Sequence, residues 1–316
     1  MARPTLLSSL LTSFIIISSI IIPFITAAAT GADASATETS CNGQPAYCDR
    51  KYSNTTYLGA HDSPFVGPLP QHNQNLNVTA QLDFGIRYLQ GQTHKIETDD
   101  AIRLCHTSCL LEDAGTLESF LVTVKTWLEG HPDEVLTLLL TNGDGVPVSK
   151  FDETFTKADI KKYAFVPEPA SEVLPIGSWP TLGEMISKGK RLVVFLDYGA
   201  DVATVPYILD EFAYYFETPF GVTDRKFPNC SIDRPPNANA DGRMYIVNHF
   251  LDVDILGVLI PDRLRAPRTN AVSGDGSIGA QANLCNSKHG RLANVILVDF
   301  VDQGQVIAAQ NKFNGF

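Results

Sequence analysis

The sequence has no cluster of basic residues and no early glycine-rich phosphate loop. Its net charge is −11 over 316 residues, so it lacks the electrostatic footprint by which proteins bind nucleic acid or adhere to anionic membranes. Contact with a membrane surface by other means is left open. Neither G-x-G-x-x-G nor G-x-x-x-x-G-K-S/T occurs in the N-terminal half, where an open nucleotide-binding sheet would carry one. We therefore expect no nucleic-acid partner and no cofactor.

The long apolar run of the chain lies at its N-terminus. Arg3 supplies a positive charge, residues 6–25 are mostly apolar, and small residues follow at 26–29. This order predicts a signal peptide over residues 1–29 and a flexible polar leader over 30–40. Because the run is long, an uncleaved N-terminal anchor is the alternative. No later segment approaches the roughly 18–20 apolar residues that span a bilayer. We expect a secreted protein and a monomer.

The six cysteines agree with export from the cell, because an even number in an exported chain suggests disulfides. We expect two local bridges and one long-range bridge: Cys41–Cys48, Cys105–Cys109 and Cys230–Cys285. A cysteine-based metal site is disfavoured because no C-x-x-C pair occurs. Three N-x-S/T sequons are expected glycosylation sites in a secreted chain: Asn54, Asn77 and Asn229.

Strand and helix patterns alternate along the mature chain. Expected strands lie at 57–59, 86–89, 102–105, 135–140, 192–196, 244–248 and 294–299. Expected helices lie at 79–84, 116–128, 149–163, 181–189, 206–216 and 305–312, whereas 261–289 has too weak a periodicity to assign. This alternation predicts an α/β fold with a parallel sheet, and we favour one (β/α)8 barrel domain of the TIM type, irregular in places, over residues 41–316. A doubly wound open sheet is the alternative.

Three of the expected strands end in titratable residues. His61 and Asp62 follow the first strand, His106 follows the third, and Asp299 ends the last. Barrel active sites are built at the C-terminal ends of the strands, so we expect these four side chains at one mouth. Two imidazoles there suit acid–base chemistry, with a carboxylate beside each ring to fix its tautomer. The alternative for each histidine is a hydrogen-bonding role in the core.

These residues also carry a family resemblance. The segments Leu58–Ser63 (LGAHDS), Gln81–Leu89 (QLDFGIRYL) and Leu104–His106 (LCH) resemble the X domain of phosphatidylinositol-specific phospholipase C, and more closely the secreted fungal-type PLC-like phosphodiesterases. Three later segments are similar to that family too: Trp179–Met185, Lys190–Phe195 and Val298–Phe300. The resemblance extends from about Cys41 to Lys312.

The resemblance implies a distorted (β/α)8 barrel that cleaves a phosphodiester by in-line attack. It implies His61 as the general base, oriented by Asp299, and His106 as the general acid, held by Asp62. In the phosphoinositide enzymes of this family the nucleophile is a hydroxyl of the substrate itself, and water then opens the cyclic phosphate. A lipid or small-molecule phosphodiester is therefore the expected substrate.

The sequence departs from the family on the second strand. The family places there an acid-x-acid pair that binds a divalent metal, or an arginine in its stead, but this chain has Gln90 and Gln92. Amides can orient a phosphate, yet they carry no charge and are poor ligands for hard cations, so we expect no metal. His94, Lys95 or Arg87 could replace the missing cation. Arg87 has the opposite strand parity and should face away from the barrel interior, which favours a salt bridge to a crossover helix.

Two further residues follow predicted strands and could line the same mouth. Asn142 comes just after the fourth strand and His249 after the sixth. Together with Gln90 and Gln92 they are the candidate substrate-binding residues, although a structural role is the alternative for Asn142 and His249.

Three functional hypotheses follow from this pattern. The first is a secreted, metal-independent phosphodiesterase. The second is a catalytically weak or inactive barrel that binds a phosphorylated or glycan ligand. The third, a metal-dependent glycerophospho- or sphingophosphodiesterase, would require acids at positions 90 and 92.

Overall fold

The computed structural model describes residues 40–96, 99–170 and 172–316. The expected signal peptide and most of the expected leader lie outside the described residues. Within the described residues no helix is both long enough and apolar enough to cross a bilayer.

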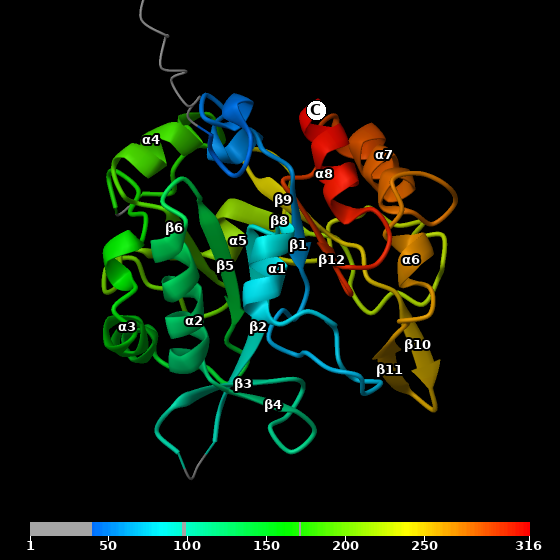
Figure 1. The fold of residues 1–316 in the computed structure, drawn as a ribbon, viewed down its shortest axis with the longest axis horizontal. Coiled ribbons are helices and arrows are strands. Elements are labelled where there is room, and N and C mark those ends of the chain that lie inside the picture. Colours follow the sequence, from blue (N-terminus) through cyan, green and yellow to red (C-terminus); the bar gives the residue numbers. More distant parts are fainter. Residues whose placement is uncertain (1–39, 97–98, 171) are drawn as a thin grey trace, which may run out of the picture. The chain divides into compact units, whose positions relative to one another are not determined.

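Eight parallel strands form a curled sheet, in the spatial order β7-β6-β5-β2-β1-β12-β9-β8 (Figure 1). Their bounds in chain order are β1 Tyr57–Ala60, β2 Tyr88–Lys95, β5 Leu136–Thr141, β6 Leu192–Leu196, β7 Ile208–Asp210, β8 Tyr215–Glu217, β9 Met244–Asn248 and β12 Val295–Val298. In the described part of the chain no ladder joins the end strands β7 and β8, which the one-turn helix α5 (Glu211–Tyr214) links. The sheet is therefore the expected barrel in an open, irregular form.

Helices cover the outer face of this sheet. They are α1 Val78–Phe84, α2 Leu117–Gly130, α3 Val148–Lys157, α4 Leu182–Ser187, α6 Ala266–Thr269, α7 Ile278–His289 and α8 Val306–Asn314. Four short 3-10 turns lie at Pro45–Tyr47, Tyr52–Asn54, Lys161–Tyr163 and Ile176–Ser178. Two of the three expected helix N-caps are confirmed: Thr116 caps α2, and Thr181 forms the capping box of α4. The third is shifted, because Asn77 rather than Thr79 caps α1.

Alternate residues of each strand enter different cores, as the period of two requires. Leu136, Leu138 and Leu140 pack with residues of α2 such as Leu121. Leu139 belongs instead to a second cluster with aromatic and aliphatic side chains of the other strands, inside the curled sheet. The same alternation directs the side chains of Gln90 and Gln92 inward and that of Arg87 outward.

Two hairpins extend beyond the C-terminal ends of the barrel strands, and both project from the lower end of the view in Figure 1. One is formed by β3 (Ile102–Cys105) and β4 (Asp113–Thr116), and the other by β10 (Asp252–Ile255) and β11 (Val258–Pro261). The strand β3 pairs antiparallel with the extended end of β2, with Leu104 opposite Thr93. It is therefore not the barrel strand that we expected, but it returns the chain to the mouth.

Two further expectations about secondary structure need correction. The segment 206–216 is not one helix but contains β7, α5 and the start of β8. The helix expected over 149–163 ends at Lys157, and a separate 3-10 turn follows at Lys161–Tyr163.

A G-x-G-x-x-G spacing occurs late in the chain, at 274–279. It lies between α6 and α7, without the preceding strand that a dinucleotide-binding loop requires.

We predict that Gly59→Ala destabilises the protein by about 1–3 kcal/mol, the usual cost of overpacking a core. A Cβ at this position would lie 2.8 Å from a methyl group of Leu297 and 3.1 Å from the ring of Tyr88. Urea unfolding monitored by circular dichroism measures the change. The matched control is Gly130→Ala, because nothing lies within 4 Å of a Cβ there and alanine is the better helix former. Equal stability of the two variants would contradict the prediction.

Candidate active site

A cavity of about 250 Å³ opens at the C-terminal ends of the barrel strands. Its walls include six residues that matter for the chemistry: His61, Gln90, Gln92, Glu217, Arg234 and Phe250. These residues come from β1, β2, β8, and the segments after β8 and β9, so the curled sheet assembles one wall from distant parts of the chain.

His61 follows β1 and is held on three sides. Its backbone N–H donates to the carbonyl of Val298, and its ring Nδ1 lies 2.9 Å from Asp299 Oδ1. Its ring stacks on Phe250 with a centroid distance of 3.6 Å and an interplanar angle of 4°. Asn73 donates to the same Asp299 oxygen at 3.1 Å. The ring plane and the Nδ1 partner are thus both determined, and Nε2 is directed toward Asp62.

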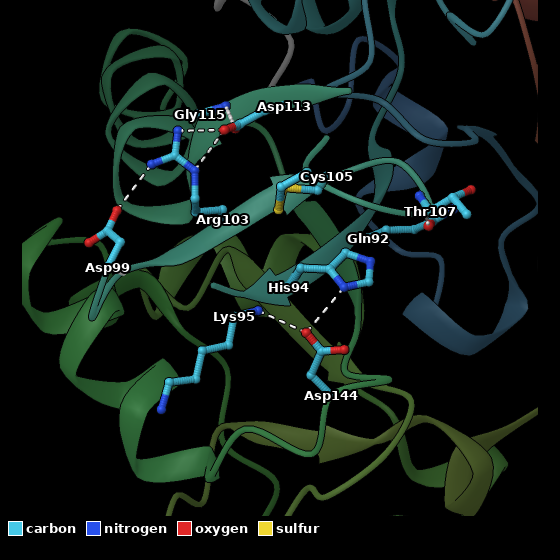
Figure 2. Close-up of a disulfide and its surroundings, with 11 residues drawn as sticks. Gln92, His94, Lys95, Asp99, Arg103, Cys105, Thr107, Asp113, Gly115 and Asp144 are labelled. Atoms are coloured by element: carbon cyan, nitrogen blue, oxygen red, sulfur yellow. Dashed lines mark hydrogen bonds and ion pairs between the residues drawn. A yellow bond between two sulfur atoms is a disulfide. The ribbon is translucent and has the colours of Figure 1, made fainter. Parts of the chain in front are cut away.

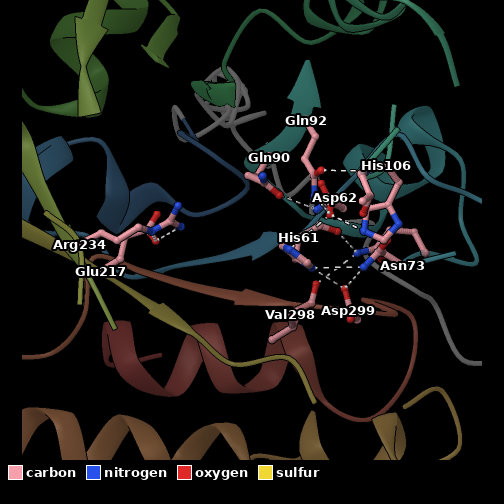
Figure 3. Close-up of polar contacts among 12 residues, drawn as sticks. His61, Asp62, Asn73, Gln90, Gln92, His106, Glu217, Arg234, Val298 and Asp299 are labelled. Atoms are coloured by element: carbon pink, nitrogen blue, oxygen red, sulfur yellow. Dashed lines mark hydrogen bonds and ion pairs between the residues drawn. The ribbon is translucent and has the colours of Figure 1, made fainter. Parts of the chain in front are cut away.

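Asp62 lies between the two histidine rings (Figure 3). Its Oδ2 is 3.4 Å from His61 Nε2 and 3.4 Å from His106 Nε2, and the side chain is inaccessible to solvent. The φ angle of Asp62 is +45°, in the left-handed region. This backbone turn lets adjacent residues, which would point to opposite faces of a strand, contribute to one cluster.

The two Nε2 atoms cannot be farther apart than about 6.8 Å, twice the distance that each keeps from Asp62 Oδ2. Hydrogen bonds to phosphate oxygens are about 2.7–3.0 Å long, so one phosphate can reach both rings. Phe65 packs against His106 at a centroid distance of 5.2 Å. His106 does not line the cavity itself, but it contacts the same carboxylate as His61.

Charge at the site alters the titration of its groups. Burial of the His61 ring by itself lowers its pKa, but the carboxylates of Asp62 and Asp299 outweigh this effect and raise the pKa to about 9. Burial raises the pKa of Asp62, against the opposing effect of the two imidazoles. Burial, with the nearby charge of Asp299, also raises the pKa of Asp252 to about 7. In the unliganded site His61 is therefore mostly protonated at neutral pH.

Gln90 and Gln92 face the cavity and also support Asp62. Gln90 Oε1 accepts the backbone N–H of Asp62 at 2.7 Å. Gln92 Nε2 donates to Asp62 Oδ2 at 2.8 Å, and its Oε1 accepts the N–H of Thr107 at 3.1 Å. We expected these amides to orient a phosphate, whereas the structure uses both polar atoms of Gln92 within the protein.

The structure places the other two candidate binding residues apart from this cavity. Asn142 is buried, and its amide bonds to the backbone of Val146 and Tyr198. His249 is also buried, and its two ring nitrogens contact Gln281 and the carbonyl of Thr269. These contacts fit the structural alternative that we left open for each residue.

The three residues considered as replacements for the missing cation also differ in their distance from the cavity. Arg87 faces out of the barrel, as its strand parity predicted, and lies over the Trp127 ring of α2. Its salt-bridge partner at 2.6 Å is not on a helix but is Glu134, in the loop between α2 and β5. The side chain of Lys95 lines a different cavity, beside Asp100. Of the three cations that we considered, His94 alone reaches the cavity wall, where it lies 3.1 Å from Asp144.

The arginine that lines the cavity is Arg234, which sequence reasoning missed. It forms an ion pair with Glu217 from β8. Burial and the charge of Glu217 hold the pKa of Glu211 well above its usual range, and burial raises the pKa of Asp197 to about 6. Arg234 therefore stands in an acidic wall. It follows β8 in a proline-rich stretch without periodicity, so no sequence signal indicated its position.

Two other supporting residues were missed for a similar reason. Asn73 lies in an irregular loop, and nothing in its neighbourhood distinguishes it from other loop amides. Phe250 could have been found, because it lies two residues after Asn248 and so has the inward parity of that strand end.

No group of three His, Cys, Asp or Glu side chains in the described ranges is arranged to hold a metal ion. At the strand positions where the family carries metal-binding acids, Gln92 is engaged with Asp62 and Thr107. These residues do not fit a hard divalent cation, so no chemical step is derived through one.

Comparisons with known proteins identify the family of the chain. The family model described as PI-PLC X 1 matches residues 47–314. The chain belongs to the PI-PLC X domain family. The resemblance drawn from the segments around His61 and His106 is therefore confirmed.

Relatives and solved structures in this family show how far the likeness extends. The chain is 57% identical over 276 residues to a PI-PLC X domain-containing protein 1 of Arthroderma benhamiae, which covers 87% of this chain and 89% of the relative. It is 45% identical over 292 residues to an uncharacterized secreted protein of the same organism, covering 87% of this chain and 65% of the relative. The phosphatidylinositol-specific phospholipase C of Listeria monocytogenes has a TM-score of 0.55 at 14% identity, over 89% of this chain and 96% of that one. This structural likeness confirms the fold.

We predict that the His61 imidazole of this X domain titrates near pH 9 in the unliganded protein, because Asp62 and Asp299 stabilise its charged form. Asp299→Asn should lower this pKa by removing one of the two charges. Nuclear magnetic resonance of labelled histidine measures both values. A His61 pKa near 6.5, the ordinary value, would contradict the prediction.

The same shift predicts a pH dependence of stability. The folded pKa of His61 lies above the unfolded value of about 6.5, so the stabilisation is fully present below about pH 6.5 and is lost as pH rises through about 9. The difference in unfolding free energy between wild type and His61→Gln should therefore decrease over this interval. A difference that grows with pH would show that the sign is wrong.

Proposed function

We propose that the protein is a phosphoric diester hydrolase in which His61 is the general base and His106 the general acid. The observation that carries the proposal is the contact of both Nε2 atoms, each at 3.4 Å, with one oxygen of the buried Asp62. Membership of the X-domain family and the fold of a phospholipase C support the reaction class.

In this proposal each group has its own task. Neutral His61 accepts the proton of the attacking hydroxyl at Nε2, while Asp299 stabilises the resulting imidazolium through Nδ1. Protonated His106 donates its Nε2 proton to the leaving alkoxide, so that a neutral alcohol departs. Asp62 stabilises the charged form of both rings and fixes their positions relative to each other.

The cavity wall favours a substrate in which the group attached to the phosphate carries hydroxyls. Glu217, Glu211 and Asp197 present carboxyl oxygens there, with one cation, Arg234, already paired. Hydroxyls can donate to these oxygens. Another anionic group would meet the charge of Asp197, whereas burial favours the neutral form of Glu211 and Arg234 neutralises Glu217. A phospholipid or a glycerophosphodiester with a neutral polyol headgroup fits this chemistry.

One observation favours a second candidate function. The arginine in the cavity is neutralised by Glu217, so the described residues supply little positive charge for a phosphate beyond the two histidines. A barrel that binds a glycan or a phosphorylated ligand without turning it over is therefore the alternative.

The proposal also includes secretion of the protein. Three disulfides are present, at Cys41–Cys48, Cys105–Cys109 and Cys230–Cys285, as expected for an oxidising compartment. Together with the likeness to an uncharacterized secreted protein, they support secretion by way of a signal peptide over residues 1–29. The sequon residues Asn54, Asn77 and Asn229 are all exposed, which suits glycosylation.

We predict that His61→Ala lowers the rate of diester hydrolysis by about 10²–10⁴-fold, the usual contribution of a general base. The assay compares wild type, His61→Ala and the remote control His131→Ala on a panel of diesters, with and without chelator. Unchanged activity of His61→Ala would refute the assigned base, and loss of wild-type activity in chelator would refute metal independence. Binding of the panel without turnover would support the second candidate.

His106→Ala should discriminate between leaving groups. A diester with an alkoxide leaving group needs the proton from His106 and should react about 10²–10⁴-fold more slowly. A nitrophenolate analogue departs without a proton and should be nearly unaffected. Equal losses on both substrates would contradict the assignment of His106 as the acid.

The pH–rate profile follows from the titration of the base. On a diester with a nitrophenolate leaving group, which needs no proton from His106, kcat/KM of the free enzyme should rise between pH 7 and about 9, because the pKa of His61 is about 9. Asp299→Asn should move this rise toward lower pH. A profile whose rise does not move in Asp299→Asn would contradict the pairing of Asp299 with the base.

A further inference from the structure

The loop that carries His106 is closed by a disulfide between its two ends. Cys105 is the last residue of β3 and is fully buried, and it bonds to Cys109, four residues along the chain (Figure 2). His106 is the first residue inside this small covalent ring. We infer that the Cys105–Cys109 disulfide is a positioning device that holds the His106 imidazole on Asp62, an inference that rests on the proposed acid role of His106.

The backbone inside the ring has a conformation that needs external restraint. Thr107 has a φ of +62°, a left-handed conformation that is unfavourable for a β-branched residue. The N–H of Ser108 bonds to the carbonyl of His106 at 2.6 Å, and the N–H of His106 to the carbonyl of Glu112 at 3.2 Å. Such a turn persists where the surrounding structure enforces it, and the covalent ring does so here.

Phe65 packs against His106, but the apolar residues directly after the ring are exposed. Leu110 and Leu111, directly after the ring, are 100% and 67% exposed. The hairpin also extends past the barrel, where β3 pairs with the protruding end of β2 rather than with a barrel strand. Its ion pairs flank the ring: Arg103, before it, pairs with Asp99 and Asp113 (Figure 2), and Glu112, after it, pairs with His72 at 3.0 Å. The disulfide therefore ties the loop to the buried end of β3.

The disulfide ring contacts the proposed catalytic groups at two points, through Thr107 and through His106. The N–H of Thr107 donates to Gln92 Oε1 at 3.1 Å, and Gln92 in turn donates to Asp62 Oδ2 at 2.8 Å. His106 contacts that same oxygen directly at 3.4 Å. Asp62 keeps its contacts with Gln90 and His61, which lie outside the ring. Opening the ring would therefore chiefly displace His106, and small displacements of a catalytic group can slow a reaction by about 10²-fold.

The chain offers a matched control for this disulfide. Cys41–Cys48 also closes a short loop, of seven residues' separation, and packs with Trp179 and Leu182 away from the cavity. Because the stabilisation from a disulfide depends on the length of the loop it closes, the two bridges should have comparable effects on unfolding. They should differ in their effect on proton donation.

The test compares two diesters that share a headgroup, one with an alkoxide and one with a nitrophenolate leaving group. Cys105→Ala/Cys109→Ala should lower kcat for the alkoxide substrate by about 10- to 100-fold and for the nitrophenolate substrate by less than about threefold. KM should change by less than about twofold. Cys41→Ala/Cys48→Ala should leave both rates unchanged. Cys109→Ala alone keeps the buried Cys105 sulfur in the core and serves if the double variant does not fold.

A double-mutant cycle separates positioning from general stability. In a His106→Ala background, opening the ring should cause no further loss, because the group that it positions is gone. Equal losses on both substrates, no loss on either, or an additional loss in the His106→Ala background would overturn the inference. If His106→Ala itself fails to discriminate between the leaving groups, the proposed acid role fails, and the inference fails with it.

Discussion

The candidate site depends on one buried carboxylate. Asp62 is closed off from solvent, yet its Oδ2 faces His61, His106 and the amide of Gln92. Removing a charge from water costs several kcal/mol unless its partners compensate, so the end of β1, the β3–β4 hairpin and the inward face of β2 must come together. The same contacts raise the pKa of His61. One interaction therefore both stabilises the site and sets the protonation of the proposed base.

The cavity beside this carboxylate explains how the chain departs from its family on β2. With amides at positions 90 and 92, the described residues bring no acid pair there, and Gln92 supports Asp62. Positive charge enters instead from Arg234, across the cavity and already paired with Glu217. Under the proposed function, this balance of charge favours hydroxyl-bearing ligands and leaves the contacts with the phosphate to the histidines.

Long periodic segments were predictable, whereas short or non-local elements were not. The strand at 192–196 is apolar throughout, and α2 repeats apolar residues at helical spacing, so each was identified from its own residues. The segment 206–216 was mistaken for a helix because two three-residue strands flank one helical turn, and no window that short shows a period. β3 has the composition of a barrel strand, and its antiparallel pairing depends on the extension of β2.

The sequence by itself determined the family, the strand ends that carry His61, Asp62 and Asp299, and the cysteine pairs. These features depend on neighbouring residues or on motifs of a few positions. Only the tertiary structure decided that Asp62 serves both histidines, that Phe250 supports His61, and that Arg234 enters the cavity. Such contacts join residues far apart in the chain, and burial creates their energies. No local pattern encodes them, because a buried charge acquires its partners only when the barrel closes around it.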